Sequence, residues 1–341
     1  MARRSLTYDP TPGAANPVLL FYKEHENDSL FPGDRYLKRI IRPIWQKLHR
    51  NQKVSGFGMS FQAMCHGLSE AGHEVIVNDY ALARANPGYP VGVIGNLSLL
   101  DNWTLPNPAL LGPSLYDQPG QAPDLFEDKR FRAYVCLADW MYDLFETQYT
   151  GKCVKWFAGI DTEAWPDRSG GPKTLDFIIY DKIHWDYEAY AENLIEPIRR
   201  ELDARGLSHR TIRYRYYDHP LYHELLTAAR GMIFLSENET QGLAYQEAMS
   251  CNVPILAWDR GYWADPQAAE HFGSPPKASC VPFFSEACGG KFTGMEEFTA
   301  SLDRFMERRD DYRPREFVKA TLSPQQSAQT YAAAYFAIAK P

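Results

Sequence analysis

The sequence of 341 residues is 45% hydrophobic, which is enough for packed cores in about two domains and excludes a disordered or fibrous chain. With 36 Lys and Arg against 43 Asp and Glu, the net charge is −7, which argues against a nucleic-acid-binding protein. No apolar run is long enough for a signal peptide or a membrane span, and the six cysteines lack the spacing of zinc sites or disulfide frameworks, so we expect a cytoplasmic protein with reduced cysteines.

Apolar runs of strand length alternate with amphipathic stretches of helical period along the chain, the pattern of parallel sheets covered by helices. The pattern begins with a strand at 18–22, a helix that starts at Gly56-Phe57-Gly58 and ends near Ala71, and a strand at 75–78. The chain is therefore predicted to be an α/β protein.

A strongly basic segment follows the first predicted strand. Between Phe31 and Lys53 the sequence carries seven basic residues against one acidic residue, with Trp and Ile at helical spacing among them. Such a segment suits a surface that rests on anionic lipid, and it equally suits an ordinary helix whose Lys and Arg side chains face water. Both interpretations of residues 35–53 stay open.

The stretch 166–172 is rich in Pro and Gly and cannot continue a helix or a central strand, so we expect a domain boundary there. A second alternating series follows, and the chain ends in an Ala-rich helix at 325–339. Two similar open sheets in tandem are therefore predicted. The elements expected in the second series are strands at 175–180, 211–217, 231–235 and 253–258, and helices at 187–205, 219–230, 242–251 and 294–309.

The densest chemical signal is a pair of carboxylates around a predicted helix start. Glu239 lies in a loop at the carboxyl end of a strand, where open α/β sheets bind ligands, and Glu247 can reach the same crevice from the helix. Between them, a phosphate can bind at the backbone amides of Gln241, Gly242 and Leu243. Because carboxylates accept hydrogen bonds from sugar hydroxyls, the combination predicts a nucleotide-sugar site. The alternative is a pair of solvent-facing glutamates on an amphipathic helix.

From Glu239 to Pro254 the residue types, spacing and expected elements together resemble the signature of GT-B glycosyltransferases of the retaining family 4 type. The signature is a Glu, seven residues that contain Gly-Leu, then Glu-Ala-Met and a Val-Pro strand. The segment from Gly56 to Val75 is similar to that family's N-terminal glycine loop, helix and strand, and the segment 156–163 is similar to the one before its linker. The resemblance implies a GT-B fold, with two Rossmann-like domains facing across a cleft.

The resemblance also implies a division of labour between the two domains. Residues 1–165 would form the acceptor-binding domain, and residues 173–319 would form the domain that binds the nucleotide-sugar donor. The family sends its C-terminal helix back to the first domain, so residues 320–341 are expected to pack there.

In the donor domain, the resemblance implies that Glu247 hydrogen-bonds the ribose hydroxyls. It also implies that Glu239 holds hydroxyls of the transferred sugar near its reacting carbon. The backbone amides offered to the sugar and the diphosphate would be those of Gln241, Gly242 and Leu243.

The resemblance further implies cations for the leaving diphosphate, an Arg after the first strand of the donor domain and a Lys five residues later. Lys182 takes the place of the Arg as a point charge, without its bidentate geometry. Tyr187 stands at the second position, so that cation is absent, and His184 or an Arg from elsewhere is expected to replace it. Tyr217 and His219 occupy the loop that would lie near the nucleotide base.

The first domain offers fewer candidates. Gly56 and Gly58 would let the backbone approach the donor, although a Gly-x-Gly serves any tight turn into a helix equally well. Residues for acceptor binding are expected in the loop after a predicted strand, and the candidates are Asn96, Asp101 and Asn102.

The predicted activity is that of a retaining hexosyltransferase of polysaccharide biosynthesis. It would use a UDP- or GDP-sugar donor and a glycan, lipid-linked or small-molecule acceptor. By the resemblance, the leaving diphosphate accepts the proton of the acceptor, so neither a metal nor a cofactor is expected. His219 and His223 have the spacing of metal ligands, but no third ligand accompanies them.

The expected partners are the nucleotide sugar, the acceptor and, through residues 35–53, an anionic membrane at the inner membrane face, with no nucleic acid. Three alternatives stay open. They are a degenerate protein that binds a nucleotide sugar or a partner enzyme without turnover, a GT-B isomerase acting on a nucleotide sugar, and a phosphorylase.

Overall fold

The computed structural model describes residues 4–11, 13–23, 56–101, 103–266 and 272–339, so the basic segment 35–53 lies outside the described residues. The described residues form two compact units, the first running to Gly159 and also including the C-terminal helix, the second comprising Ile160–Ser323. The division precedes the stretch 166–172, where the sequence analysis places a boundary. Residues of that stretch are held by the second unit, because the amide of Arg168 donates to the carbonyl of Cys251 at 3.0 Å.

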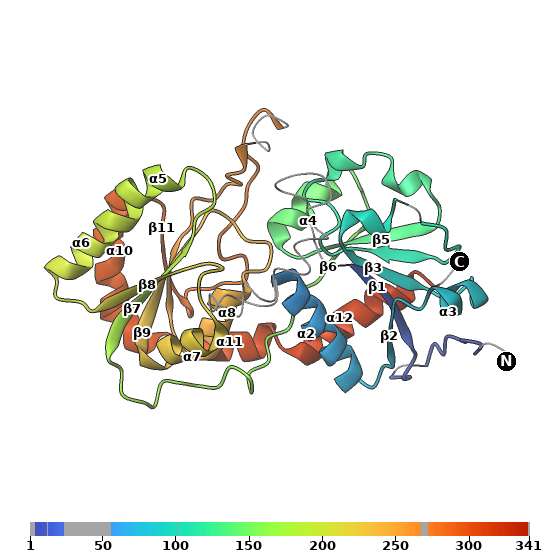
Figure 1. Ribbon diagram of the computed structural model, residues 1–341, viewed down its shortest axis with the longest axis horizontal. Helices are drawn as coiled ribbons and strands as arrows, with labels where there is room; N and C mark the ends of the chain where they lie inside the picture. Colours follow the sequence, from blue (N-terminus) through green and yellow to red (C-terminus); the bar gives the residue numbers. More distant parts are fainter. Residues whose placement is uncertain (1–3, 12, 24–55, 102, 267–271, 340–341) are drawn as a thin grey trace. The chain divides into compact units, whose positions relative to one another are not determined.

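The first unit is built on a six-stranded parallel sheet in the order β2-β1-β3-β4-β5-β6. Helices lie on both faces of this sheet (Figure 1). The strands are β1 (Val18–Lys23), β2 (Val75–Val77), β3 (Val91–Gly95), β4 (Ala109–Leu111), β5 (Phe131–Cys136) and β6 (Cys153–Lys155). The helices are α2 (Gly56–Glu70), α3 (Tyr80–Ala85), α4 (Asp139–Glu146) and α12 (Pro324–Ala337), and three short 3-10 turns lie at Leu97–Leu99, Pro119–Gln121 and Leu125–Glu127.

The second unit repeats this plan with a five-stranded parallel sheet in the order β11-β10-β9-β7-β8 (Figure 1). Its strands are β7 (Leu175–Lys182), β8 (His209–Arg213), β9 (Ala229–Ser236), β10 (Ile255–Trp258) and β11 (Gly289–Phe292). Its helices are α5 (Tyr187–Tyr190), α6 (Glu196–Ala204), α7 (His219–Ala228), α8 (Leu243–Ser250), α10 (Met295–Arg308) and α11 (Pro314–Thr321). The prediction of an α/β protein with two open parallel sheets is confirmed.

The central strands β7, β9 and β10 of the second sheet are apolar along most of their length because helices cover both faces. Successive residues of a strand point to opposite faces, so Ile179 packs in a cluster with α6 and α10. Its neighbour Tyr180 contacts Tyr222 of α7 on the other face, with ring centroids 6.0 Å apart. The two faces are thus buried by different helices, which leaves the strand ends as the accessible edges of the sheet.

Two predicted elements of the second unit need correction. The helix expected at 187–205 is interrupted by a π-helical turn at Ala191–Ile195, followed by Pro197 in the first turn of α6, since proline cannot donate the backbone bond of a continuous helix. The strand expected at 211–217 ends at Arg213. The next residues form a turn in which the amide of Tyr216 donates to the carbonyl of Arg213 at 3.0 Å.

Helix α12 packs within the first unit by specific contacts. Its Tyr335 hydroxyl accepts a hydrogen bond from the amide of Leu19 at 2.9 Å, and the indole of Trp156 donates to the carbonyl of Ser327 at 3.0 Å. A Cβ at Gly92 of β3 would overlap the hydroxyl of Tyr331. The close approach of α12 to the sheet therefore requires glycine at this position.

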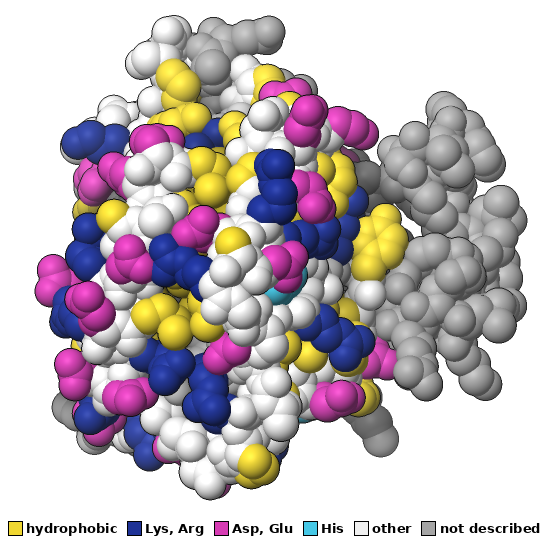
Figure 2. Space-filling view, turned by 90° about the vertical axis from the view of Figure 1, so that its left-hand side faces the viewer, with side chains coloured by type: hydrophobic (Ala, Val, Ile, Leu, Met, Phe, Trp, Pro, Cys, Tyr) yellow, Lys and Arg dark blue, Asp and Glu magenta, His cyan; other side chains and the backbone are white. Residues whose placement is uncertain are grey.

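The surface of the second unit mixes charges of both signs. Figure 2 shows Lys and Arg side chains interspersed with Asp and Glu side chains on the face of this unit that it presents, without a large patch of one sign. Within the described part of the chain, none of the helices combines the length and the apolar character needed to cross a membrane.

Candidate functional site

Three strand ends bring the predicted donor-site residues to one edge of the second sheet. Strands β8, β7 and β9 are parallel neighbours, so their carboxyl ends lie side by side. In the register of the sheet, Asp181 pairs with Arg213 and Lys182 pairs with Ser236. The carboxyl edge of a parallel sheet is where α/β folds bind ligands. The loops after β7, β8 and β9 therefore form the candidate site.

Lys182 and Glu239 are paired at this edge. The Lys182 ammonium lies 2.6 Å and 2.8 Å from the two carboxylate oxygens of Glu239, whose side chain is 7% exposed. Ser236 Oγ donates a further hydrogen bond to the same carboxylate at 2.9 Å. Burial disfavours the charge of Lys182, but the carboxylate outweighs this effect, and the pKa of Lys182 is raised. Lys182 therefore keeps its positive charge near neutral pH.

Glu237 joins the loop after β9 to the loop after β7. Its buried carboxylate accepts hydrogen bonds from the backbone amides of His184 and Trp185, at 2.8 Å and 3.0 Å. Burial raises the pKa of Glu237, and these bonds oppose the rise. The sequence does not reveal this role of Glu237, because nothing in its spacing shows that its partners lie more than 50 positions earlier.

Gly242 makes the turn into α8 possible. Its backbone is left-handed, with φ +76°, and a Cβ at this position would overlap the ring of Tyr245. Both constraints favour glycine. The turn at Gly242 presents the first backbone amides of α8, from Leu243 onward, at the same edge as Glu239. The side chain of Gln241 turns away from solvent and donates to Gln246 Oε1 at 2.8 Å.

Glu247 is buried in the second turn of α8. It is 6% exposed, and within the described residues its carboxyl group has no hydrogen-bond or ion-pair partner. Burial alone raises its pKa to about 8. Its oxygens are not among the fully buried side-chain atoms that lack a partner, so they remain reachable by the donors of a ligand. Glu247 is therefore a side chain at this edge that a hydrogen-bonding ligand could satisfy.

Tyr217 lies near both glutamates. Its hydroxyl is 2.7 Å from that of Tyr180, and both rings are buried. Burial raises the pKa of Tyr217. The hydrogen bond with Tyr180 opposes this rise, and the charges of Glu247 and Glu239 add to it. The structure thus brings Tyr217 together with the two predicted carboxylates.

The two histidines of α7 contact an aromatic side chain. The ring of His223 stacks on Trp165 with centroids 4.1 Å apart, and the ring of His219 lies 6.2 Å from the same indole. Burial lowers the pKa of both imidazoles. The residues that the structure describes contain no group of three or more His, Cys, Asp and Glu side chains placed to hold a metal ion.

His184, named above as a possible replacement for the missing second cation, lies at this edge. Burial, followed by the charges of Lys182, Arg215 and Arg213, lowers the pKa of His184 to about 4. The imidazole is therefore neutral at pH 7 in the protein without a ligand. The same charges show that two arginines lie near this edge.

The predicted residues of the first unit lie on α2 and after β3. Gly56 begins α2, Gly58 is buried within it, and a Cβ at Gly56 would meet open space, so sterics do not require glycine there. Asn96 caps the 3-10 turn that follows β3, where its Oδ1 accepts from the amide of Ser98 at 2.9 Å. Asp101 is exposed, and Asn102 lies outside the described residues.

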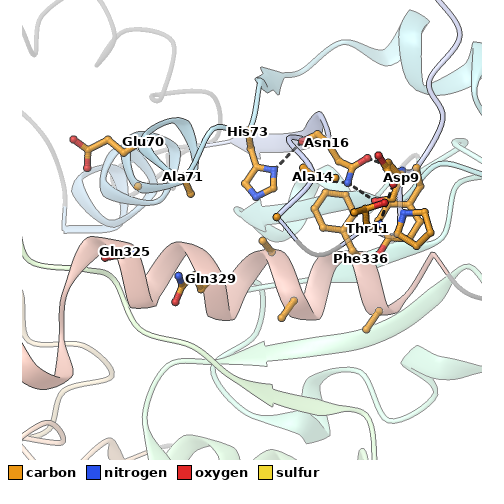
Figure 3. A pocket seen from close by; sticks show the side chains of 17 residues that line it. Asp9, Thr11, Ala14, Asn16, Glu70, Ala71, His73, Gln325, Gln329 and Phe336 are labelled. Carbon is orange, nitrogen blue, oxygen red and sulfur yellow. Dashed lines mark hydrogen bonds between the residues drawn. The ribbon is translucent and has the colours of Figure 1, made fainter.

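A groove of about 760 Å³ opens elsewhere in the first unit, between α2, α12 and the segment before β1 (Figure 3). His73 lies at its wall and shares a hydrogen bond of 2.9 Å with the carbonyl of Asn16, and Phe336 lies across from it (Figure 3). Asn16 and His73 precede β1 and β2, so the groove lies at the amino edge of the sheet. It contains none of the predicted site residues.

Comparison with known proteins shows likeness in structure but not in sequence. No known protein-family profile matches the chain, and no curated protein sequence matches it. AviGT4, a glycosyltransferase involved in avilamycin A biosynthesis, aligns over 86% of this chain and 92% of its own, with 12% identity and a TM-score of 0.52. Sucrose-phosphate synthase from Thermosynechococcus elongatus aligns over 94% of this chain and 98% of its own, with 11% identity and a TM-score of 0.55. The chain therefore has the GT-B fold, as the resemblance predicts.

Proposed function

We propose that the chain is a retaining glycosyltransferase whose second unit binds a nucleoside diphosphate sugar. The observation that carries this proposal is the buried carboxyl group of Glu247, which has no partner within the described residues and lies in the helix that begins at Gly242. A ribose offers two neighbouring hydroxyl donors, and a carboxylate can accept both. The ribose of a bound nucleotide would thus supply hydrogen-bond donors to the Glu247 carboxylate.

The ion pair beside this helix suits the transferred sugar and its leaving group. The Glu239 carboxylate, which bonds to Lys182 and Ser236, is also of the chemical type that accepts hydrogen bonds from sugar hydroxyls. The first amides of α8 face an anion at the same edge. In the proposed reaction, the acceptor oxygen bonds to the anomeric carbon as the bond from that carbon to the diphosphate breaks, and the departing phosphate oxygen takes the proton of the acceptor hydroxyl. Lys182 and the first amides of α8 stabilise the negative charge that develops on the diphosphate.

The first unit is proposed to bind the acceptor, a glycan, a lipid-linked sugar or a small molecule. Asn96 and Asp101 follow β3 at the carboxyl edge of the first sheet, where α/β folds bind ligands. An N-cap such as Asn96 also has a purely structural role, because it satisfies an amide of the turn. Replacing the exposed Asp101 by Ala therefore tests acceptor binding with less effect on folding.

Nucleotide binding tests the donor site directly. A thermal-shift series would compare UDP, GDP and ADP at millimolar concentration on the wild type, on Glu247→Ala and on Glu307→Ala, an exposed position of α10. We expect one nucleotide to raise the melting temperature of the wild type and of Glu307→Ala, and the rise to shrink in Glu247→Ala. A wild type that no nucleotide stabilises would refute the proposal.

Turnover separates an active transferase from a protein that only binds. Release of nucleoside diphosphate from the matching nucleotide sugar should depend on an added acceptor, and NMR of the product should show the donor's anomeric configuration retained. Binding without such release would favour the degenerate nucleotide-sugar-binding protein.

A further inference from the structure

The proposed diphosphate lacks a free cation on the loop after β7. Lys182 is held by both carboxylate oxygens of Glu239, and His184 is neutral at pH 7. Tyr187 occupies the position at which the resemblance expects a second cation. A diphosphate that leaves with its negative charge needs compensation at this edge. The positive charge must therefore come from another element.

The end of β8 places an arginine at the position of Tyr187. The Arg213 guanidinium lies 3.5 Å from the centroid of the Tyr187 ring. A cation therefore covers the Tyr that stands where the resemblance implies a Lys. The Nε atom of Arg213 is 3.9 Å from the buried carboxylate of Asp181, which helps to orient the guanidinium. The Arg213 side chain is 42% exposed. The planar guanidinium can therefore rest on the aromatic ring and still present N–H groups to a ligand.

A second arginine follows in the turn after β8. The backbone of Arg215 is left-handed, with φ +72°, a conformation that costs free energy for any residue with a Cβ. The amide of the preceding Tyr214 donates to the carbonyl of Asp181 at 2.8 Å, which fixes the turn to the end of β7. Strained backbone that the surroundings hold in place is a feature of ligand-binding turns.

Arg215 is exposed, and its guanidinium forms no hydrogen bond or ion pair with the residues that the structure describes. It lies 5.3 Å from the centroid of the Tyr214 ring, and the Lys182 ammonium lies 4.8 Å from the same centroid. Cations gathered in this way repel one another in the empty protein. An anion bound among them would remove that repulsion.

We propose that Arg213 and Arg215 bind the diphosphate of the donor and replace the cation that is missing at Tyr187. This inference rests on the proposed function, because it assumes a nucleoside diphosphate at the carboxyl edge of the second sheet. It assigns Lys182 mainly to Glu239 and gives the bidentate phosphate contacts to the arginines of β8 and its turn. Both arginines are diphosphate-binding residues in this assignment, and neither transfers a proton.

The experiment compares nucleoside monophosphate with diphosphate, because the arginines should matter for the part of the ligand that differs. Isothermal titration calorimetry would measure UMP, UDP, GMP and GDP on the wild type, on Arg213→Gln, on Arg215→Gly and on Arg210→Gln. Arg210 is an exposed residue at the other end of β8 and serves as the matched control. Glycine is chosen at 215 because it removes the side chain and suits the left-handed backbone.

We expect Arg213→Gln and Arg215→Gly each to weaken diphosphate binding by roughly ten- to hundredfold, with a much smaller effect on the monophosphate. Arg210→Gln should behave as the wild type, and Arg215→Gly should melt no lower than the wild type. Adding Tyr187→Lys to Arg213→Gln should restore part of the diphosphate affinity.

Two results would overturn the assignment. One is a wild-type preference for diphosphate over monophosphate that persists unchanged in both arginine variants. The other is an equal loss for the two ligands, which would place the arginines at the nucleoside. A wild type that binds no nucleotide at all would instead refute the proposed function, and the assignment with it, so the two failures are distinguishable.

Discussion

Replacing Glu247 by Gln should stabilise the empty protein at neutral and alkaline pH. Burial raises the pKa of the Glu247 carboxyl from 4.5 to about 8, so the folded protein holds this proton more tightly than the unfolded chain does. The stability that this proton confers is complete below pH 4.5 and is lost as the pH rises to about 8. Glutamine does not titrate, so the variant keeps a constant contribution over this range.

The size of the effect follows from the two pKa values. One pKa unit corresponds to about 1.4 kcal/mol, and integration between pH 5 and pH 8 gives a loss of about 3 to 4 kcal/mol for the wild type relative to Glu247→Gln. Urea unfolding of both proteins at pH 5, 6, 7 and 8 measures this difference directly. Glu307→Gln, at an exposed position, serves as the control and should follow the wild type.

Nucleotide gives the same experiment a second arm. Ribose hydroxyls that donate to the ionised carboxylate would lower the pKa of Glu247, so a saturating nucleoside diphosphate should flatten the pH dependence of the wild type. Stability curves of the empty wild type and Glu247→Gln that stay parallel from pH 5 to pH 8 would refute this reasoning, because Glu247 would then titrate alike in the folded and unfolded states.

Three further experiments test the packing and the site. Gly242→Ala should unfold at a lower urea concentration and bind nucleotide more weakly, because a Cβ at this position is strained and meets the Tyr245 ring. Unchanged nucleotide affinity would show that this turn takes no part in binding. Gly92→Ala should destabilise the fold by about 1 to 3 kcal/mol, measured by urea unfolding, since a Cβ would displace α12; a neutral result would contradict that packing. A double-mutant cycle of Lys182→Met and Glu239→Gln should give a coupling of about 2 kcal/mol in stability, and no coupling would contradict the ion pair.

The order of elements could be predicted from the sequence because hydrophobic period and Gly or Pro punctuation act locally. Helix α8 and strand β10 fall within a few residues of their expected bounds. The prediction of a strand at 211–217 was the clearest error. Tyr and Arg alternate there with the period of a strand, and Tyr has a high strand propensity. Only the left-handed backbone of Arg215 shows the turn. The helix expected at 187–205 was split at a position that the pattern of apolar residues does not reveal.

The site was predictable where one local motif carries it, and less so where partners come from separate strands. Glu239, Gly242 and Glu247 lie within one turn and helix, so their spacing alone predicts a common edge. The bond between Lys182 and Glu239 depends on the register of β7 with β9. The approach of Arg213 to Tyr187 likewise depends on the register of β7 with β8, and a single sequence does not state register.

Several features at the carboxyl edge of the second sheet lower the stability of the protein when no ligand is bound. Glu247 is buried without a partner within the described residues, and Arg215 and Asp186 have left-handed backbones with φ of +72° and +48°. A ligand with neighbouring hydroxyl donors and a diphosphate would satisfy the carboxyl group and neutralise the arginine. If the edge is built for such a ligand, substitutions at Glu247 and Arg215 should raise stability while they lower nucleotide affinity. A substitution at Gly242, whose conformation already suits glycine, should lower both. At Glu247 and Arg215 the changes in stability and in nucleotide affinity should thus have opposite signs, and at Gly242 they should have the same sign. This pattern distinguishes a ligand-binding edge from an ordinary cluster of loops.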